Sequence, residues 1–318
     1  MMLPADGRLS PQARGVLLAT GTALISGLAV YLNAFGVRQV PDAVVYTTAK
    51  NGVAALILVG LLFLFGRGRE AVNLNGRRRL GLLAVALIGG SVPFVLFFSG
   101  LAMASAPSAA FIHKTLFIWV AVLAVPLLGE RLGYLQIGAM GVLLAGVLLV
   151  GPPLGLAWGL GETMIAAATL FWSVEVVVAK RLLAGISSNT LAVARMGLGF
   201  VVLLGYLGLT GRLGGLFALS ADGLFWVLVT GLLLAGYVST WYAGLRLAPA
   251  TTVTSVLVGG GVVTAVLTVI GGGAAPGAAV LVGYLLIALS VAVIMGLTLG
   301  LTLGAGRASA RRRVPARG

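Results

Sequence analysis

The sequence has no cysteine, a single histidine and only seven acidic residues among its 318. The missing cysteines exclude disulfides, thiolate metal sites and cysteine nucleophiles, and one histidine is too few for a histidine-based metal centre. Charged residues make up 9% of the chain, against roughly 25% in soluble domains. Phosphate-binding glycine loops and the Gly-x-Ser-x-Gly elbow of hydrolases are also absent, so we expect no enzyme and no ATP hydrolysis.

Apolar residues are what the chain has in excess. They make up 60% of it, with a mean hydropathy of +1.13. No soluble core of this size could bury so much apolar surface, so lipid must surround most of the chain. The same numbers exclude a soluble enzyme, a nucleic-acid-binding module and a disordered chain. The net charge of +14 therefore indicates topology rather than a nucleic-acid partner.

Ten apolar runs are long enough to cross a bilayer, which needs about 20 residues per helix. They lie at about 15–36, 44–65, 80–100, 106–128, 133–150, 157–179, 188–209, 223–244, 251–270 and 278–301. All ten must be helical, because a spanning segment has to satisfy its own backbone hydrogen bonds. The first run is too long for a cleavable signal peptide. The predicted fold is an all-α membrane protein with ten transmembrane helices.

The basic residues test this count. With ten crossings, 16 of the 21 lysines and arginines fall on one side, and Arg38 and Arg212 alone on the other. The positive-inside rule then predicts that both termini are cytoplasmic. Arginine outnumbers lysine 18 to 3, as in GC-rich bacterial genomes, so we expect a multi-pass protein of the bacterial cytoplasmic (inner) membrane.

The chain also repeats itself. A shift of 144 residues places 100–133 on 244–277 without a gap, and ten of these 34 positions are identical. The sequence therefore divides into a tail (1–14), two five-helix units (15–150 and 151–303) and a basic tail (304–318). Because five is odd, the second unit enters the membrane from the opposite side, and such inverted repeats are typical of secondary transporters.

Several segments resemble one family. Gly100-Leu-Ala-Met-Ala-Ser-Ala-Pro-Ser-Ala-Ala, Gly129-Glu130-Arg131-Leu132 and the glycine-rich helix at 138–146 are similar to the first repeat of the drug/metabolite transporter superfamily, EamA type. Residues 168–183, with Trp172, look like the start of its second repeat. The resemblance implies ten helices, inverted repeats and a central cavity open alternately to either side. It also implies transport of amino acids, other small metabolites or drugs, often outward.

One departure from this pattern concerns Glu130. The second repeat should also carry a Gly-Glu pair, but Gly273 is followed by Ala274. Glu130 is a candidate gating residue at the inner face, and its outer counterpart is missing.

Buried ionisable residues are candidates for function, because each is costly inside a membrane. Lys114 is the strongest, since it lies deep in the fourth helix and its repeat counterpart is Val258. Its ammonium could hold a substrate carboxylate or phosphate, or form a structural ion pair. His113 diverges from Lys114 by about 100° around the helix, so we expect it to form an interhelical hydrogen bond, although it remains a candidate substrate contact.

Lys50, Asn33 and Trp172 complete the candidate substrate-binding set. Lys50 could form the outer half of the site or pair with Glu162, which otherwise suits the N-terminus of its own helix. Trp172 could receive an amphipathic ring or simply pack. Trp241 and Tyr242, near the end of the eighth helix, are expected to be anchors at the membrane interface.

Glu175 and Arg195 share the inner third of consecutive helices. They could form a buried ion pair, an inner gate or a proton-binding carboxylate, or Glu175 could turn toward Lys180 and Arg181.

Two backbone features suggest hinges. Pro93 predicts a kink in the third helix. Gly259, Gly260 and Gly261, in the middle of the ninth helix, favour either bending or close helix packing.

The leading hypothesis is a secondary transporter that moves a small amphipathic metabolite, most plausibly an amino acid, outward by alternating access. The alternatives are a flippase or scramblase for lipid-linked headgroups and, less favoured, a membrane enzyme or channel. The expected partners are a small-molecule substrate and the lipid bilayer, with the chain as a monomer or weak homodimer. No cofactor or metal is indicated, and proton coupling is left open.

Overall fold

The computed structural model describes residues 9–64, 70, 74–151 and 158–311, and every regular element in these ranges is a helix. The elements are α1 (Pro11–Gln39), α2 (Ala43–Leu64), α4 (Gly76–Gly90), α5 (Val92–Leu101), α6 (Ala106–Lys114), α7 (Leu116–Leu128), α8 (Tyr134–Val150), α9 (Leu160–Leu182), α10 (Ser188–Val193), the π-helix η2 (Ala194–Leu198), α11 (Gly199–Leu209), the 3-10 helix η3 (Leu213–Leu216), α12 (Ala221–Leu247), α13 (Ala250–Val258), α14 (Gly260–Ile270) and α15 (Ala278–Arg311).

The ten predicted crossings correspond to these elements. Within the described residues, nine helical stretches are long and apolar enough to span a membrane, and α8 is a shorter apolar helix of 17 residues. Four crossings are each built from consecutive elements: α4 with α5, α6 with α7, α10 to α11, and α13 with α14. The all-α membrane fold is thus confirmed.

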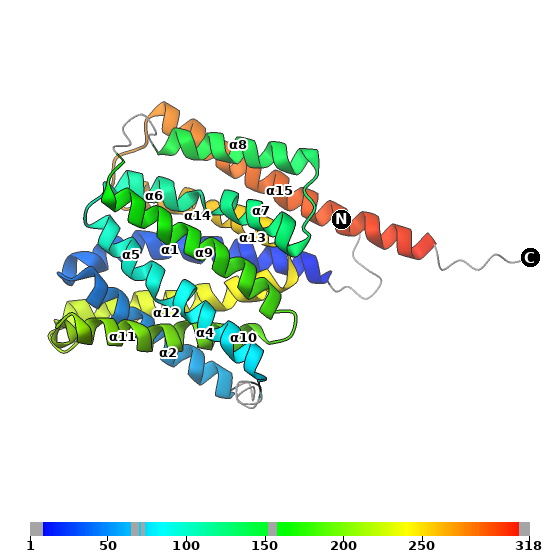
Figure 1. The fold of residues 1–318 in the computed structure, drawn as a ribbon. Coiled ribbons are helices and arrows are strands. Elements are labelled where there is room, and N and C mark those ends of the chain that lie inside the picture. Colours follow the sequence, from blue (N-terminus) through cyan, green and yellow to red (C-terminus); the bar gives the residue numbers. More distant parts are fainter. Residues whose placement is uncertain (1–8, 65–69, 71–73, 152–157, 312–318) are drawn as a thin grey trace, which may run out of the picture.

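Both ends of the described chain lie at one end of the bundle. In Figure 1, α1 begins and α15 ends on the right-hand side. We call this the basic end, because it carries most of the loop lysines and arginines. Six of the sixteen basic residues assigned to it lie outside the described residues: Arg8, Arg67, Arg69, Arg312, Arg313 and Arg317. The last helix continues to Arg311, past residue 304, where the basic tail was expected to start.

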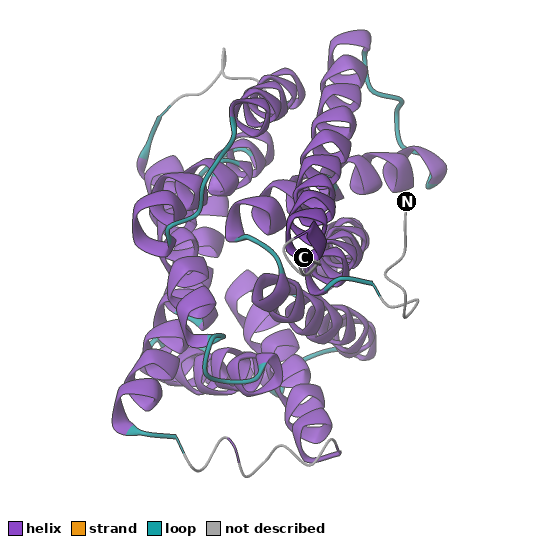
Figure 2. Cartoon of the chain, turned by 90° about the vertical axis from the view of Figure 1, so that its right-hand side faces the viewer, coloured by secondary structure: helices purple, strands orange, loops and turns teal. Residues whose placement is uncertain are grey.

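The two halves of the chain pack against each other with matching pairs of helices. The first helix of one half, α1, lies along α12 of the other, and its counterpart α9 lies along α4 and α5. The fifth helices, α8 and α15, run side by side at one edge of the bundle (Figures 1 and 2). Each half is therefore completed by the other.

Repeat-related glycines make two of these contacts close. A Cβ on Gly100 would lie 2.7 Å from the carbonyl oxygen of Gly161 in α9. A Cβ on its counterpart Gly244 would lie 3.2 Å from the carbonyl oxygen of Gly15 in α1. The identity at 100 and 244 thus reflects a packing requirement, because any side chain there would push the first helix of the other half away.

The fourth and ninth crossings are interrupted at repeat-related positions, 115 and 259. The Thr115 amide donates to the Ile112 carbonyl, and the Gly259 amide donates to the Val256 carbonyl, three residues back in both cases. A tight turn of this kind shortens the hydrogen-bonding pattern for a few residues and bends the helix. The two halves therefore share an interruption deep within the bundle, and the sequence predicted only the glycine-rich one.

Candidate functional site

Lys114 lies between the two interrupted crossings. It is the last residue of α6, directly before the interruption at Thr115, and it is partly buried. Its Nζ lies 3.1 Å from where a Cβ on Gly261 would be, so a side chain at 261 would crowd the ammonium. Within the described residues, Lys114 has no hydrogen-bond or ion-pair partner. The structural ion pair considered for Lys114 is thus not formed here.

Lys50 forms a second polar cluster, with residues of α1, α2 and α12. Its Nζ donates to Asn33 Oδ1 at 3.0 Å, and the Tyr46 hydroxyl donates to the same oxygen at 3.1 Å. Tyr46 also shares a 2.8 Å hydrogen bond with Thr230. Two sequence candidates, Lys50 and Asn33, are therefore in contact.

The expected alternative partner of Lys50 is engaged elsewhere. Glu162 Oε2 accepts a 3.1 Å hydrogen bond from the Gly159 amide and caps the start of α9. A carboxylate is favourable at a helix N-terminus, so this cap explains Glu162 without Lys50. Next to Lys50, the buried Asn51 has no hydrogen-bond partner for either amide atom within the described residues.

His113 and Trp172 also lie together. Their ring centroids are 5.0 Å apart at an angle of 69°, and Phe97 lies 5.4 Å from His113 and 5.6 Å from Trp172. The prediction that His113 forms an interhelical hydrogen bond is wrong for its Nδ1 atom, which is buried without a partner among the described residues. Aromatic packing takes its place, on a face of α6 different from that of Lys114.

Trp172 compensates for the missing amide of Pro93. Because proline has no N–H, the carbonyl four residues earlier, at Gly89, loses its helical donor. Trp172 Nε1 donates to this carbonyl at 3.1 Å. The helix is interrupted next to Pro93, since α4 ends at Gly90 and α5 begins at Val92. Trp172 is 8% exposed and mainly packs, as the simpler of its two interpretations predicted.

Glu175, Arg195 and Tyr242 form a buried cluster from three crossings. Glu175 is 1% exposed, and its Oε1 accepts a 2.5 Å hydrogen bond from the Tyr242 hydroxyl. The Arg195 guanidinium carbon lies 5.9 Å from the Tyr242 ring centroid. Glu175 and Arg195 are both described, yet they form no ion pair within 4.0 Å, and Arg195 Nε has no hydrogen-bond partner. The direct ion pair is therefore wrong for this conformation.

The expected position of Tyr242 is also wrong. Tyr242 is fully buried and Trp241 is 3% exposed, so neither anchors the protein at the lipid interface. Both occur near the end of α12, where sequence reasoning places interfacial aromatics. The positions of Trp241 and Tyr242 in the sequence do not indicate that they are buried, because their burial depends on how α9 and α10 pack against α12.

Glu130 caps a helix of the other half. Its Oε1 accepts from the Ala250 amide at 2.6 Å, and its Oε2 accepts from the Thr251 amide at 3.1 Å and the Thr251 hydroxyl at 2.7 Å. These are unsatisfied donors at the N-terminus of α13, whose N-cap residue, Pro249, provides no side-chain oxygen. A glutamate in the loop between α7 and α8 thus holds α13.

The N-cap of α6, in the first half, explains why the second half has no counterpart of Glu130. Residue 105 is the counterpart of Pro249, and Ser105 caps α6 itself by accepting from the Ser108 amide at 3.2 Å. A self-capped α6 needs no external carboxylate, which accounts for Ala274 at the position equivalent to Glu130. Sequence comparison of the halves showed the departure, but not its local compensation.

Two cations extend this contact at the basic end. Lys180 Nζ donates to the carbonyls of Leu245 at 2.5 Å and Ala248 at 2.7 Å, at the end of α12. Arg181 donates to the Leu127 carbonyl at 2.6 Å, at the end of α7. The expected turn of Glu175 toward these two residues is therefore wrong. Together with Glu130 they tie α7, α9, α12 and α13 together.

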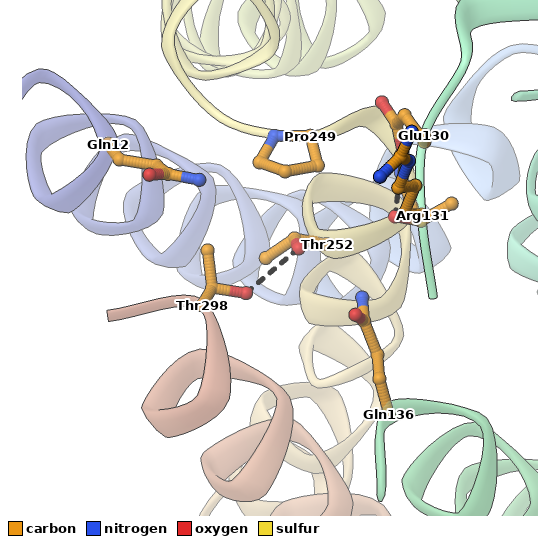
Figure 3. A pocket seen from close by; sticks show the side chains of 8 residues that line it. Gln12, Glu130, Arg131, Gln136, Pro249, Thr252 and Thr298 are labelled. Atoms are coloured by element: carbon orange, nitrogen blue, oxygen red, sulfur yellow. Dashed lines mark hydrogen bonds between the residues drawn. The ribbon is translucent and has the colours of Figure 1, made fainter. Parts of the chain in front are cut away.

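A small pocket opens beside the Glu130 cap (Figure 3). It lies among the start of α1, the loop before α8, and helices α13 and α15. Its lining residues carry two amides, three hydroxyls, one carboxylate, one guanidinium and one proline ring: Gln12, Glu130, Arg131, Gln136, Pro249, Thr251, Thr252 and Thr298. The 3.0 Å hydrogen bond between Thr252 and Thr298, drawn in Figure 3, joins α13 to α15 at the pocket.

The glycine triplet serves three different purposes. Gly259 occupies the interruption between α13 and α14. A Cβ on Gly260 would lie 2.8 Å from the Ala23 carbonyl oxygen, so this glycine allows α14 to approach α1 closely. Gly261 leaves space for the Lys114 ammonium. Bending and close packing, the two interpretations of the triplet, therefore apply to different residues.

Comparison with known proteins agrees with this architecture. The model of the EamA-like transporter family matches residues 13–151 and again 159–296, nearly the whole chain in two repeats. The chain belongs to the EamA-like transporter family. This EamA-like protein is also similar to a solved structure titled "Crystal structure of protein", with a TM-score of 0.76 at 19% identity. That match covers 91% of this chain and 100% of the other. A comparison with curated proteins gives no significant match.

Family membership makes the chain a membrane transporter rather than an enzyme, with a small-molecule substrate and a lipid bilayer as its surroundings. The boundary between the two matched segments lies between α8 and α9.

Proposed function

We propose that this EamA-like protein carries a small anionic or zwitterionic metabolite, such as an amino acid, by alternating access, and that Lys114 binds the anionic group. The observation that supports this most directly is the partly buried Lys114 ammonium, which has no partner among the described residues and lies between the interruptions of both halves. An unpaired charge in a membrane protein is costly, so its retention favours a ligand as counter-ion.

The charges around the proposed site favour an anion. Away from their ends, the described membrane-spanning helices contain three cations, Lys50, Lys114 and Arg195. The buried carboxylates of these helices are Glu175 and Glu162, and Glu162 is used in the cap at the start of α9. Lys50, held by Asn33 and Tyr46, would attract the anionic end during its passage through the other half of the bundle. His113 and Trp172, whose rings pack together on the neighbouring face of α6, would support this side of the site.

The proposed orientation places both termini in the cytoplasm of a bacterial cell and the two halves in opposite directions across the inner membrane. Two observations support it: α1 begins and α15 ends at the basic end (Figure 1), and the loop cations favour that side. The direction we propose is export.

The contacts of Glu130 support a gate at the basic end. Its three hydrogen bonds join the loop of one half to α13 of the other, so α13 cannot swing away from α7 and α8 while they hold. Charge-assisted bonds of this kind are about twice as strong as neutral ones. We therefore propose that this cap breaks when the site opens to the cytoplasm.

Counterflow in proteoliposomes tests the proposal. Vesicles loaded in turn with amino acids, organic acids and phosphorylated metabolites should show saturable exchange for one anionic class. Lys114→Ala should reduce this exchange at least tenfold, because the counter-charge in the site is lost, whereas Lys114→Arg should retain part of it.

Arg246→Ala is the matched control, because Arg246 is an exposed cation at the basic end. It should exchange substrate at the wild-type rate. Full activity of Lys114→Ala would contradict the assignment of the anion site. Flux that grows linearly without saturation would contradict a carrier, and flipping of labelled lipid headgroups without metabolite exchange would favour the flippase hypothesis.

A further inference from the structure

We propose that Glu175 is a proton-binding site and that its protonation is coupled to substrate movement; this rests on the proposed transport function. The Glu175 carboxylate lies between three crossings. The Tyr242 hydroxyl donates to one of its oxygens, and Arg195 lies nearby without forming an ion pair with it. A proton, taken up by a carboxylate oxygen and released from it unchanged, is the ligand of this site.

The hydrogen bonds of the cluster differ from those of a structural ion pair. A structural pair in a low-dielectric interior needs direct contact, with the remaining donors satisfied. Here Arg195 Nε has no partner, although the residue is only 6% exposed, and Glu175 is bonded to a neutral hydroxyl instead. The cluster therefore has an unused donor that could receive the Glu175 carboxylate in another conformation.

Two elements around the cluster depart from regular α-helix. Arg195 belongs to the π-helix Ala194–Leu198, a distortion often found at functional sites. Gly89, where a Cβ would collide with Glu175 Cγ and lie 3.2 Å from Arg195 Nε, is one residue before the end of α4. A shift at the interruption between α4 and α5 would thus change the separation of Glu175 and Arg195.

Protonation of Glu175 would change the net charge of the cluster. Arginine remains cationic, so the cluster is neutral with Glu175 ionised and carries one positive charge with Glu175 protonated. The other titratable groups facing Glu175 are Tyr242 and Tyr237 of α12, and both interact with it electrostatically. From α4 the facing residue is Gly89, which has no charge. Lys180, further along α9, is bonded to carbonyls of α12.

The cluster is also connected to the proposed substrate site. Trp172, one turn before Glu175 on α9, binds the Gly89 carbonyl and contacts the His113 ring. His113 precedes Lys114. The effect of a substrate bound at Lys114 would therefore be transmitted to the cluster through α6 and packed side chains. A contiguous connection of this kind can couple two sites.

Substrate-linked proton movement in proteoliposomes tests this inference. Wild-type protein is reconstituted with a pH-sensitive dye inside the vesicles, and the exchanged metabolite identified by counterflow is added outside. We expect a pH change that follows substrate movement, and accumulation of substrate when a pH gradient is imposed. Glu175→Gln should reduce both at least tenfold and make counterflow insensitive to pH, because an amide keeps the shape of the carboxylate but takes up no proton.

Glu162→Gln is the matched control, because Glu162 is a 7% exposed carboxylate of the same helix that only caps its N-terminus. It should retain proton movement and gradient-driven accumulation. Wild-type exchange without any proton movement would overturn the inference while leaving the transport function intact. Glu175→Gln with wild-type accumulation would also overturn it. Absence of exchange in the wild type would instead contradict the proposed function itself.

Discussion

Individual polar side chains in this bundle mostly serve backbone groups that helix ends and interruptions leave unsatisfied. Trp172 donates to the Gly89 carbonyl, Glu130 accepts from the start of α13, and Lys180 donates to the end of α12. Within a bilayer no water can replace such partners, so each has a structural cost if removed. Lys114, by contrast, has no hydrogen-bond or ion-pair partner among the described residues, and this makes it the candidate for ligand binding.

Replacing Trp172 should leave the Gly89 carbonyl, which has no helical donor because of Pro93, without a hydrogen-bond partner. Trp172→Phe keeps the aromatic packing but removes the donor to the buried Gly89 carbonyl, which should lower the free energy of unfolding by about 1–3 kcal/mol. The double variant Trp172→Phe with Pro93→Ala should recover about 1 kcal/mol, because the introduced alanine supplies the missing amide. Unfolding of the purified protein by denaturant measures both.

Trp226→Phe is the control for ring size. Trp226 stacks on Phe35 with ring centroids 5.6 Å apart, and phenylalanine can keep this stacking. Its free energy of unfolding should change by less than about 1 kcal/mol. Equal losses in the two single variants, with no recovery in the double variant, would show that the hydrogen bond to Gly89 does not matter.

The sequence predicted which residue types matter at this scale, but not their partners. Lys114, Glu175 and Arg195 were recognisable because an ionisable group in an apolar run is unusual in itself. Tyr242, the direct partner of Glu175, was not recognisable, because a tyrosine near a helix end is common and its burial depends on neighbouring helices. The partner of Glu130 lies 120 residues away in the chain, and no local pattern points to it.

Helical elements show where the bundle can bend. The third, fourth and ninth crossings are interrupted and the seventh contains a π-helix, whereas α2, α9 and α12 are continuous. In the sequence, Pro93 and the glycine triplet predicted two of these sites. The interruption at Thr115 and the π-helix had no such signal, because their residues are compatible with a regular helix and tertiary packing decides.

The contact of α4 with the π-helix should not tolerate a side chain. Gly90→Ala would drive a Cβ into the Arg195 carbonyl oxygen, which is backbone and cannot rotate away. We expect a loss of about 1–3 kcal/mol in the free energy of unfolding. Gly205→Ala in α11, where a Cβ would meet nothing within 4 Å, should instead stabilise the helix by up to about 1 kcal/mol. Equal changes in denaturant unfolding would contradict the close packing.

The cap on α13 should control access from the basic end. Because the chain has no cysteine, Ser255→Cys introduces a single thiol at a fully buried position of α13. Adding Glu130→Gln removes the charge from the cap and should weaken the closed state by about 1–2 kcal/mol, equivalent to about a 5–30-fold faster labelling by a thiol reagent.

Glu162→Gln in the same cysteine background is the control, because it alters a carboxylate cap within one helix of a single half. It should label at the rate of Ser255→Cys alone. An unchanged rate with Glu130→Gln would show that the cap does not close the basic end.

At the scale of the whole molecule, two five-helix units complete each other across an extensive interface. The number, length and order of the helices could be predicted from the sequence, because a bilayer fixes the length of each apolar run and the basic residues between the runs separate them. The contacts between the halves could not, because repeat-related glycines indicate close packing without naming the helix they meet. Only the structure shows that Gly100 and Gly244 each pack against the first helix of the other half.

Alternating access to Lys114 is tested most directly by a single thiol beside it. Gly261→Cys places the thiol next to the flexible Lys114 ammonium in a chain with no other cysteine. In sealed vesicles of known orientation, a membrane-impermeant thiol reagent should label this residue from either side, and the transported substrate should slow both reactions. Labelling from one side alone, whether or not substrate is present, would contradict a carrier that alternates around Lys114.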